Sequence, residues 1–146
     1  MRKPAISTLT LTGTLALAMG SLTMSPATVS AAEMSAVEEG MVIATTRKKG
    51  NCMGCHKISG IKEMVADLKK RGIKVPKDTL RAHESHGNVG PALVNMKARY
   101  PDKAKLRAEI YDPQVMNPNT IMPPFGKHNI LRKDELDKVV EYIHTL

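Results

Sequence analysis

Two cysteines and a histidine form the most chemically specific motif of this sequence. They stand in Cys52-Met53-Gly54-Cys55-His56, a C-x-x-C-H pattern that is typical of covalent c-type haem attachment. The spacing suits that chemistry because one helical turn brings both thiols to the two vinyl groups on one porphyrin edge and places the next imidazole under the iron. We therefore predict one covalently attached haem c, with Cys52 and Cys55 forming the thioethers and His56 as an axial ligand.

Three other uses of the two cysteines compete with haem attachment. A thioredoxin-like dithiol needs a βαβ context, and the sequence has no strand-type alternation of useful length. A zinc site would recruit His83 and His86, an H-x-x-H pair downstream of the motif. A simple disulfide is disfavoured because the spacing is tight. The histidine directly after Cys55 favours haem, and a zinc or dithiol protein without haem is the alternative.

The sixth position of the iron needs a second side chain from further along the sequence. The candidates are methionines and histidines: Met64, Met96, Met116, Met122, His83, His86, His128 and His144. Met64 and Met96 lie in helical patterns and are expected in the core, whereas the nearly terminal His144 is expected in solvent. Met122 precedes two prolines, which fix much of the backbone beside its thioether. We predict Met122 as the ligand, with Met116, His83 and His86 as other candidates.

Short helices joined by loops are expected to position these side chains. Apolar residues at Ile61, Met64, Val65 and Leu68 have the i, i+3, i+4, i+7 spacing of an amphipathic helix. Similar apolar spacing predicts helices over 34–46, 61–72, 91–99, 103–111 and 133–144. Some of these segments also begin at a proline or end at a glycine or at polar residues, which are common helix boundaries. Residues 73–90 read as a loop, and four prolines make 113–130 an irregular strap. The fold class is therefore all-α, one domain of four to five short helices.

The composition agrees with a small domain built around a cofactor. The chain has 146 residues with one Phe, three Tyr and no Trp, so aromatic rings supply little of the core. A buried porphyrin would provide the missing apolar bulk. Two cysteines exclude a disulfide-rich scaffold, and the length excludes a large multidomain enzyme.

Residues 1–32 have the pattern of a secretory signal peptide. Arg2 and Lys3 precede an uncharged, largely apolar stretch over 5–20, and small residues at 29–32 allow cleavage after Ala31 or Ala32. The mature domain is then 33–146, without a membrane span. Loss of the two basic residues lowers the formal net charge from +8 to +6. Export to the periplasm argues against nucleic acid as the partner of this basic chain, and an acidic protein surface or an anionic substrate fits better. From charge alone, a solvated surface that is simply basic is the favoured interpretation.

Beyond the haem motif, several longer strings resemble SoxX, the mono-haem cytochrome c family of sulfur-oxidising complexes. The resemblance runs over about 47–146 and rests on the segments 47–56 (RKKGNCMGCH), 87–93 (GNVGPAL), 98–101 (ARYP), 117–126 (NPNTIMPPFG) and 139–143 (VVEYI). The stretch 58–86 is longer than the family's usual spacer, and nothing is transferred onto it. The resemblance implies a periplasmic class I cytochrome c fold with His56 and Met122 as axial ligands. It also implies that the Pro91 carbonyl orients the His56 ring.

The resemblance further implies a role in a heteromeric enzyme. SoxX pairs with SoxA, and the SoxAX complex acts as an L-cysteine S-thiosulfotransferase that oxidatively couples thiosulfate to a carrier-protein cysteine. The SoxA-like subunit holds the catalytic haem, so this chain would accept electrons without a catalytic residue of its own and pass them to a downstream acceptor cytochrome. A freestanding soluble cytochrome c is the alternative. Exposed Ile121, Phe125 and Met53 around the haem edge would favour a permanent interface, and a ring of lysines would favour transient docking.

Overall fold

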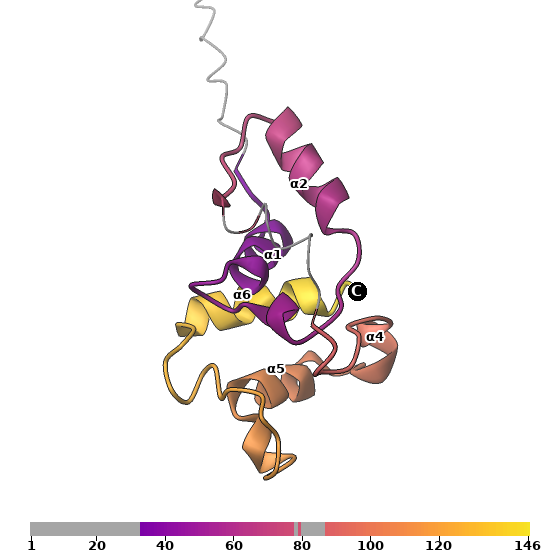
Figure 1. Cartoon of the computed structure of the whole chain (residues 1–146), viewed down its shortest axis with the longest axis vertical. Coiled ribbons are helices and arrows are strands. Elements are labelled where there is room, and N and C mark those ends of the chain that lie inside the picture. The colour runs from indigo at the N-terminus through magenta and orange to yellow at the C-terminus, as the bar shows by residue number, and fades with distance from the viewer. Residues whose placement is uncertain (1–32, 78, 80–86) are drawn as a thin grey trace, which may run out of the picture.

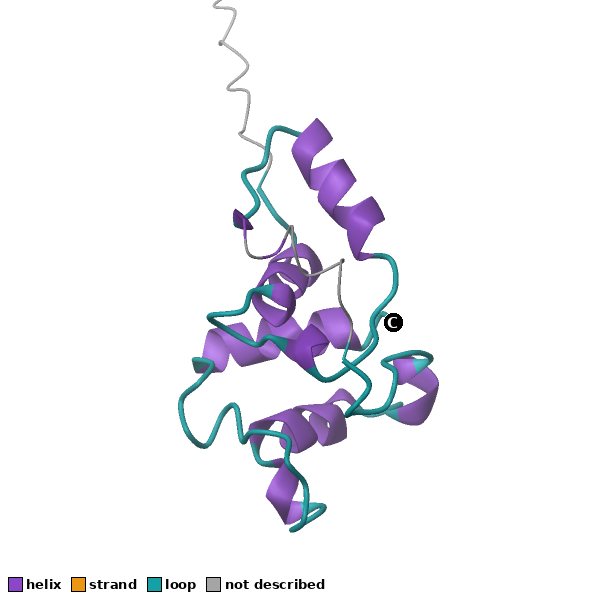
Figure 2. Ribbon diagram, in the orientation of Figure 1, coloured by secondary structure: helices purple, strands orange, loops and turns teal. Residues whose placement is uncertain are grey.

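Helices and loops make up the described part of the chain, which comprises residues 33–77, 79 and 87–146 of a computed structural model (Figure 1). The α-helices are α1 (Ala36–Thr45), α2 (Ile61–Lys70), α4 (Met96–Arg99), α5 (Lys103–Tyr111) and α6 (Lys133–Ile143), with 3-10 turns at Cys52–Gly54 and Pro113–Val115. Over these residues there is no strand (Figure 2), which confirms the predicted all-α class. The predicted signal peptide, His83 and His86 lie outside the described residues. No described helix is long and apolar enough to cross a membrane.

The first and last helices cross at close range and form the centre of the fold. Ser35 and Glu38 form a capping box that starts α1, with the Glu38 carboxylate accepting from the Ser35 N–H at 2.7 Å. Gly40 lies at the crossing, where a Cβ atom would come 2.0 Å from the Lys138 carbonyl oxygen. Only glycine leaves room for this approach, so Gly40 sets how closely α1 packs on α6.

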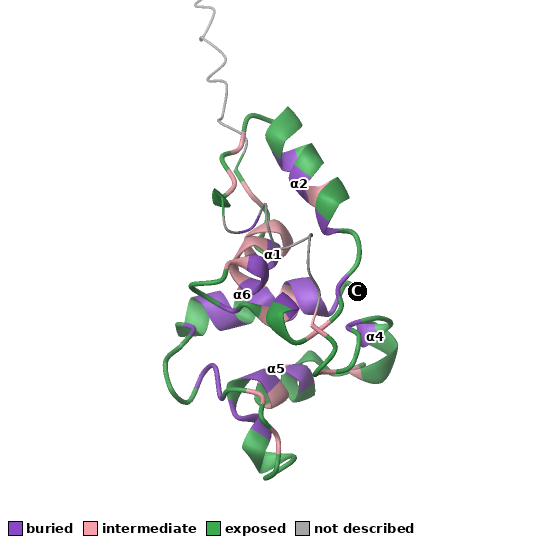
Figure 3. Cartoon of the chain, viewed as in Figure 1, coloured by how far each residue is buried: buried purple, intermediate pink, exposed green. Residues whose placement is uncertain are grey.

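The helix α5 adds a second layer against α6 and leads into the strap. Leu106 and Ile110 are its buried residues, while Arg107 reaches across to Asp137 at 2.6 Å. Buried positions on α1, α5 and α6 form the core of the bundle (Figure 3). The helix ends at Tyr111, since Asp112 precedes a proline and leaves the helical region. The core therefore holds both ends of the segment between α5 and α6.

The helix predicted over 91–99 is wrong in its first half. Only Met96–Arg99 is helical, and Asn95 before it has a left-handed φ of 52°. The backbone of 91–95 bonds to the haem-motif region instead, with the Leu93 N–H donating to the Lys57 carbonyl at 2.9 Å. These long-range hydrogen bonds use backbone N–H and C=O groups that a helix over 91–95 would pair internally. The tertiary contacts therefore prevail over the local helical pattern.

The expectation that His144 is solvated is also wrong. Its side chain is buried, and Nε2 lies 3.0 Å from the Tyr100 carbonyl oxygen. The chain end folds back here, because the Met96 N–H donates to the Leu146 carbonyl at 2.8 Å. The exposure of His144 was predicted only from its position near the end of the chain. That prediction fails because the last residues complete the packing around α4.

A buried carboxylate joins α6 to the segment that precedes the haem motif. Glu135, whose side chain is 7 % exposed, accepts the Arg132 N–H at 3.0 Å and forms an ion pair with Lys49. Burial opposes ionisation of Glu135, but these hydrogen bonds and the charge of Lys49 outweigh it and hold the pKa of the carboxyl below 4.5. The ion pair therefore links α6 to the residues just before the haem motif.

We expect Glu135→Gln to lower the free energy of unfolding of the holoprotein by about 2 kcal/mol at pH 7, the scale of a hydrogen bond to a charged group. Because the folded pKa lies below the unfolded one, this stabilisation is present above pH 4.5 and is lost as the pH falls through the folded pKa. Denaturant unfolding at several pH values measures it. A difference between wild type and variant that does not shrink in acid would contradict the role of the charge.

Candidate functional site: the haem-binding cavity

The haem motif forms a single tight turn between α1 and α2. The Gly50 N–H donates to the Ile43 carbonyl at 3.0 Å, and the His56 N–H donates to the Cys52 carbonyl at 2.8 Å. Cys52 is half-buried and Cys55 is exposed, both as free thiols. Burial raises the pKa of the Cys52 thiol to about 12, so the thiolate that dithiol exchange requires is disfavoured at neutral pH.

The ring of His56 is held by the segment that precedes α4. His56 Nδ1 lies 2.7 Å from the Pro91 carbonyl oxygen, the contact that the family resemblance implies. Because a carbonyl only accepts, this bond requires the proton on Nδ1 and leaves Nε2 with a free lone pair for a metal. Gly90 passes directly against the ring, and a Cβ atom there would come 2.4 Å from His56 Cε1. The glycine and the proline together fix the orientation of the imidazole.

Met122 lies near the middle of the strap, residues 113–130, on the other wall of the site. Its N–H donates to Thr120 Oγ1 at 3.2 Å. The base of the strap is closed where the N–H groups of Gly126 and Lys127 both donate to the Tyr111 carbonyl, at 3.2 and 3.1 Å. Lys127 also pairs with the buried Asp112 at 2.7 Å. The strap is therefore anchored to α5 close to Met122.

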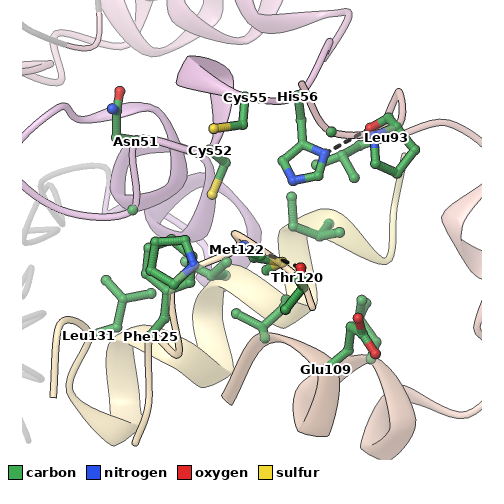
Figure 4. Close-up of a pocket in the computed structure, with 18 of the residues that line it drawn as sticks. Asn51, Cys52, Cys55, His56, Leu93, Glu109, Thr120, Met122, Phe125 and Leu131 are labelled. Atoms are coloured by element: carbon green, nitrogen blue, oxygen red, sulfur yellow. Dashed lines mark hydrogen bonds between the residues drawn. The ribbon is translucent and has the colours of Figure 1, made fainter. Parts of the chain in front are cut away.

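The motif, the Pro91 segment and the strap enclose a cavity of about 530 Å³. Both cysteines, His56, Pro91 and Met122 all line it, and His56 and Met122 project from opposite walls (Figure 4). Its lining is mainly apolar and includes Leu93, Leu106, Ile110, Phe125, Leu131, Val139 and Ile143. The volume lies within the range of about 300 to 1,000 Å³ that is typical of cofactor pockets. Two thiols at one edge, an imidazole and a thioether in an apolar cavity match the donor set of a covalently bound haem.

The other candidate ligands are placed less favourably than Met122. Met116 is 66 % exposed and does not line the cavity. Met96 does line it, but its sulfur accepts a hydrogen bond from the Arg99 guanidinium at 3.2 Å. Met64 packs against the core and His128 is exposed, both away from the cavity.

The chain matches the family model of cytochrome c over residues 37–146, and it therefore belongs to the cytochrome c family. An uncharacterized lipoprotein of Aquifex aeolicus (strain VF5) is 29 % identical over 97 residues, which are 66 % of this chain and 37 % of that protein. The chain thus spans little more than a third of the length of this relative. No solved structure matches it.

Family membership decides between the uses of the two cysteines. Cytochromes c carry covalently bound haem c and transfer electrons, so Cys52 and Cys55 fit the attachment of that cofactor, and the zinc and dithiol alternatives are set aside. Three contacts of the site were not expected from the sequence: Gly90 on the His56 ring, Thr120 on the Met122 N–H, and the Asp112–Lys127 pair. The only local sequence signal for the contact between Gly90 and the His56 ring is the Gly90-Pro91 pair itself.

We expect Gly90→Ala to disturb the histidine side of the site. The added methyl group must push the His56 ring away from the Pro91 carbonyl, because the atoms it meets are less than 3.0 Å away. The holoprotein yield should fall severalfold, and the visible spectrum should show altered iron coordination. Gly60→Ala is the control for a glycine substitution away from the site: its left-handed φ of 80° costs stability, but no atom lies within 4 Å of the added methyl group, so the spectrum should stay that of the wild type. A variant with the wild-type spectrum and yield would contradict the contact.

Proposed function

We propose that this cytochrome c is the electron-accepting subunit of a periplasmic SoxAX-like complex. In that role it would form a heterodimer with a SoxA-like haem subunit, which couples thiosulfate oxidatively to a carrier-protein cysteine, and it would pass electrons to a downstream acceptor cytochrome. The strings at 87–93 and 117–126 that resemble SoxX support this function. A signal-peptide pattern at 1–32 and the lipoprotein named above support export.

We further propose His56 and Met122 as the axial ligands, with the Pro91 carbonyl orienting His56. The free lone pair on His56 Nε2 and the position of Met122 on the facing wall support this pair. A neutral thioether favours reduced iron and raises the reduction potential. The chain would therefore be suited to accept electrons from a partner of lower potential.

Exposed apolar side chains on the strap, here called the apolar patch, are the observation that supports a heterodimer. Ile121 lines the cavity and is also 77 % exposed, so it lies at the mouth. Val115 and Met116, on the same strap, are 76 % and 66 % exposed. One exposed apolar side chain at the cavity mouth, with two more on the same strap, favours a lasting interface over transient docking. Phe125 and Met53 were also predicted around the haem edge, but both are buried and cannot contribute.

Purification from the periplasm tests this function. The holoprotein should co-elute with a larger haem protein, and the pair should survive moderate salt. Ile121→Asp should abolish the association, whereas Val94→Asp, which introduces the same charge at an exposed valine outside the cavity lining, should not. Complete dissociation between low and physiological salt would indicate a freestanding carrier that docks by charge.

A further inference from the structure

Residues 57–77, the basic segment, carry most of the net positive charge of the domain. They contain six lysines and one arginine against two acidic residues, a net charge of +5. The whole of residues 33–146 has a formal net charge of only +6. The net positive charge of residues 33–146 therefore arises almost entirely from these 21 residues.

The lysines of the basic segment form no ion pair with any described residue. Its arginine, Arg71, is neutralised by Glu38 on α1 and by Asp67, the latter at 3.0 Å. The lysines form no ion pair there and are all exposed: Lys57, Lys62, Lys69, Lys70, Lys74 and Lys77. Like charges held together repel one another, so a negatively charged surface against this side would relieve that repulsion.

The helix α2 carries its three lysines on one part of its exposed side, here called the lysine flank. At about 100° per residue, Lys62 and Lys69 lie beside the exposed Ala66, and Lys70 lies at the edge of the flank, next to Glu63. Asp67 lies beyond Glu63, and Ile61, Val65 and Leu68 are buried beneath. The helix stands at the opposite end of the molecule from α5 (Figure 1), and no residue of 57–77 lines the haem cavity. The lysine flank is thus a surface separate from the apolar patch.

The composition of the basic segment indicates what this flank binds. Protein interfaces are enriched in aromatic residues and arginine and depleted in lysine, yet the segment has no aromatic residue and its arginine is already paired. Clusters of four to eight basic residues are typical of binding to anionic lipid headgroups. The exposed side of α2 offers no large apolar side chain for insertion into a bilayer. We propose that the basic segment docks the folded domain on an anionic phospholipid surface through headgroup charge alone.

Vesicle co-sedimentation of the holoprotein tests this proposal, which does not depend on the SoxAX-like role. Wild type should bind phosphatidylglycerol-containing vesicles at low salt and not pure phosphatidylcholine vesicles. A lysine beside an anionic bilayer strengthens binding about fivefold, so Lys62→Gln/Lys69→Gln/Lys70→Gln should weaken binding about 100-fold. The matched control is Lys97→Gln/Lys105→Gln/Lys133→Gln, which removes three exposed, unpaired lysines from α4, α5 and α6 and leaves the same net charge. This control should change binding less than fivefold.

Three results would overturn the proposal. Equal losses in the two triple variants would mean that net charge, and not the lysine flank, governs binding. Failure of the wild type to bind anionic vesicles would exclude the lipid surface. If the α2 triple variant keeps vesicle binding but loses a co-purifying acidic protein, the flank docks a protein instead. Haem content and helix content equal to wild type in both variants establish that the fold is unchanged.

Discussion

We expect Met122→Ala to leave the haem covalently attached while abolishing the weak sulfur-to-iron charge-transfer band. The alanine cannot reach the iron, so that position opens to water or an added ligand. Met122→His should instead supply a nitrogen donor and lower the reduction potential, within the range of roughly 0.8 V that axial ligands set. Visible spectroscopy and potentiometric titration of the purified variants measure both effects.

Two other methionines provide the controls for this prediction. Met96 shares the cavity wall and is buried, so Met96→Leu keeps the volume and should retain the band with at most about 1.5 kcal/mol of lost stability. Met116 is exposed, and Met116→Leu should change neither band nor stability. If Met122→Ala keeps both the band and the potential, the assignment is wrong, and Met96 becomes the next candidate because its sulfur lies at the same cavity.

The second large effect concerns haem attachment. Cys52→Ser and Cys55→Ser each leave one thiol, so each should give at most one thioether and much less haem-stained protein. The double variant should carry no covalent haem. Because the cavity of about 530 Å³ is lined mainly by apolar side chains, an empty chain exposes them to water, and we expect the double variant to fold poorly.

Denaturing gels with haem staining, together with intact mass, measure this outcome. Expression in a cytoplasm without the attachment machinery should give the same apoprotein from the wild-type sequence. The conservative change Met53→Leu, at the buried position between the two cysteines, keeps both thiols and should keep full haem content. Full covalent haem in the double Cys→Ser variant would contradict attachment through this motif.

The sequence predicted those elements whose signals are local. The helices at Ile61–Lys70 and Lys103–Tyr111 were expected because apolar periodicity is followed by an explicit end, at Gly72 and at Asp112 before proline. The haem motif is equally local, since all its chemistry lies within five residues. The two prolines after Met122 are likewise a local signal, and they predict the irregular strap.

Apart from the Pro91–His56 contact, which the family resemblance implies, contacts between distant segments could not be predicted from the sequence. The helix over 91–99 was overestimated because the bond between Leu93 and Lys57 joins residues 36 positions apart. The burial of His144 depends on Tyr100, and the Lys49–Glu135 pair spans 86 positions. In each case a tertiary partner, which no periodicity encodes, decides the local structure.

Proton NMR of the reduced holoprotein tests the central claim, that His56 and Met122 hold one haem between them, most directly. The ring current of the macrocycle should shift one methionine methyl resonance far upfield, since only an axial methionine holds its methyl group over the ring. We expect that resonance in the wild type and in Met96→Leu and its loss in Met122→Leu. Its persistence in Met122→Leu, or its absence from the wild type, would contradict the account.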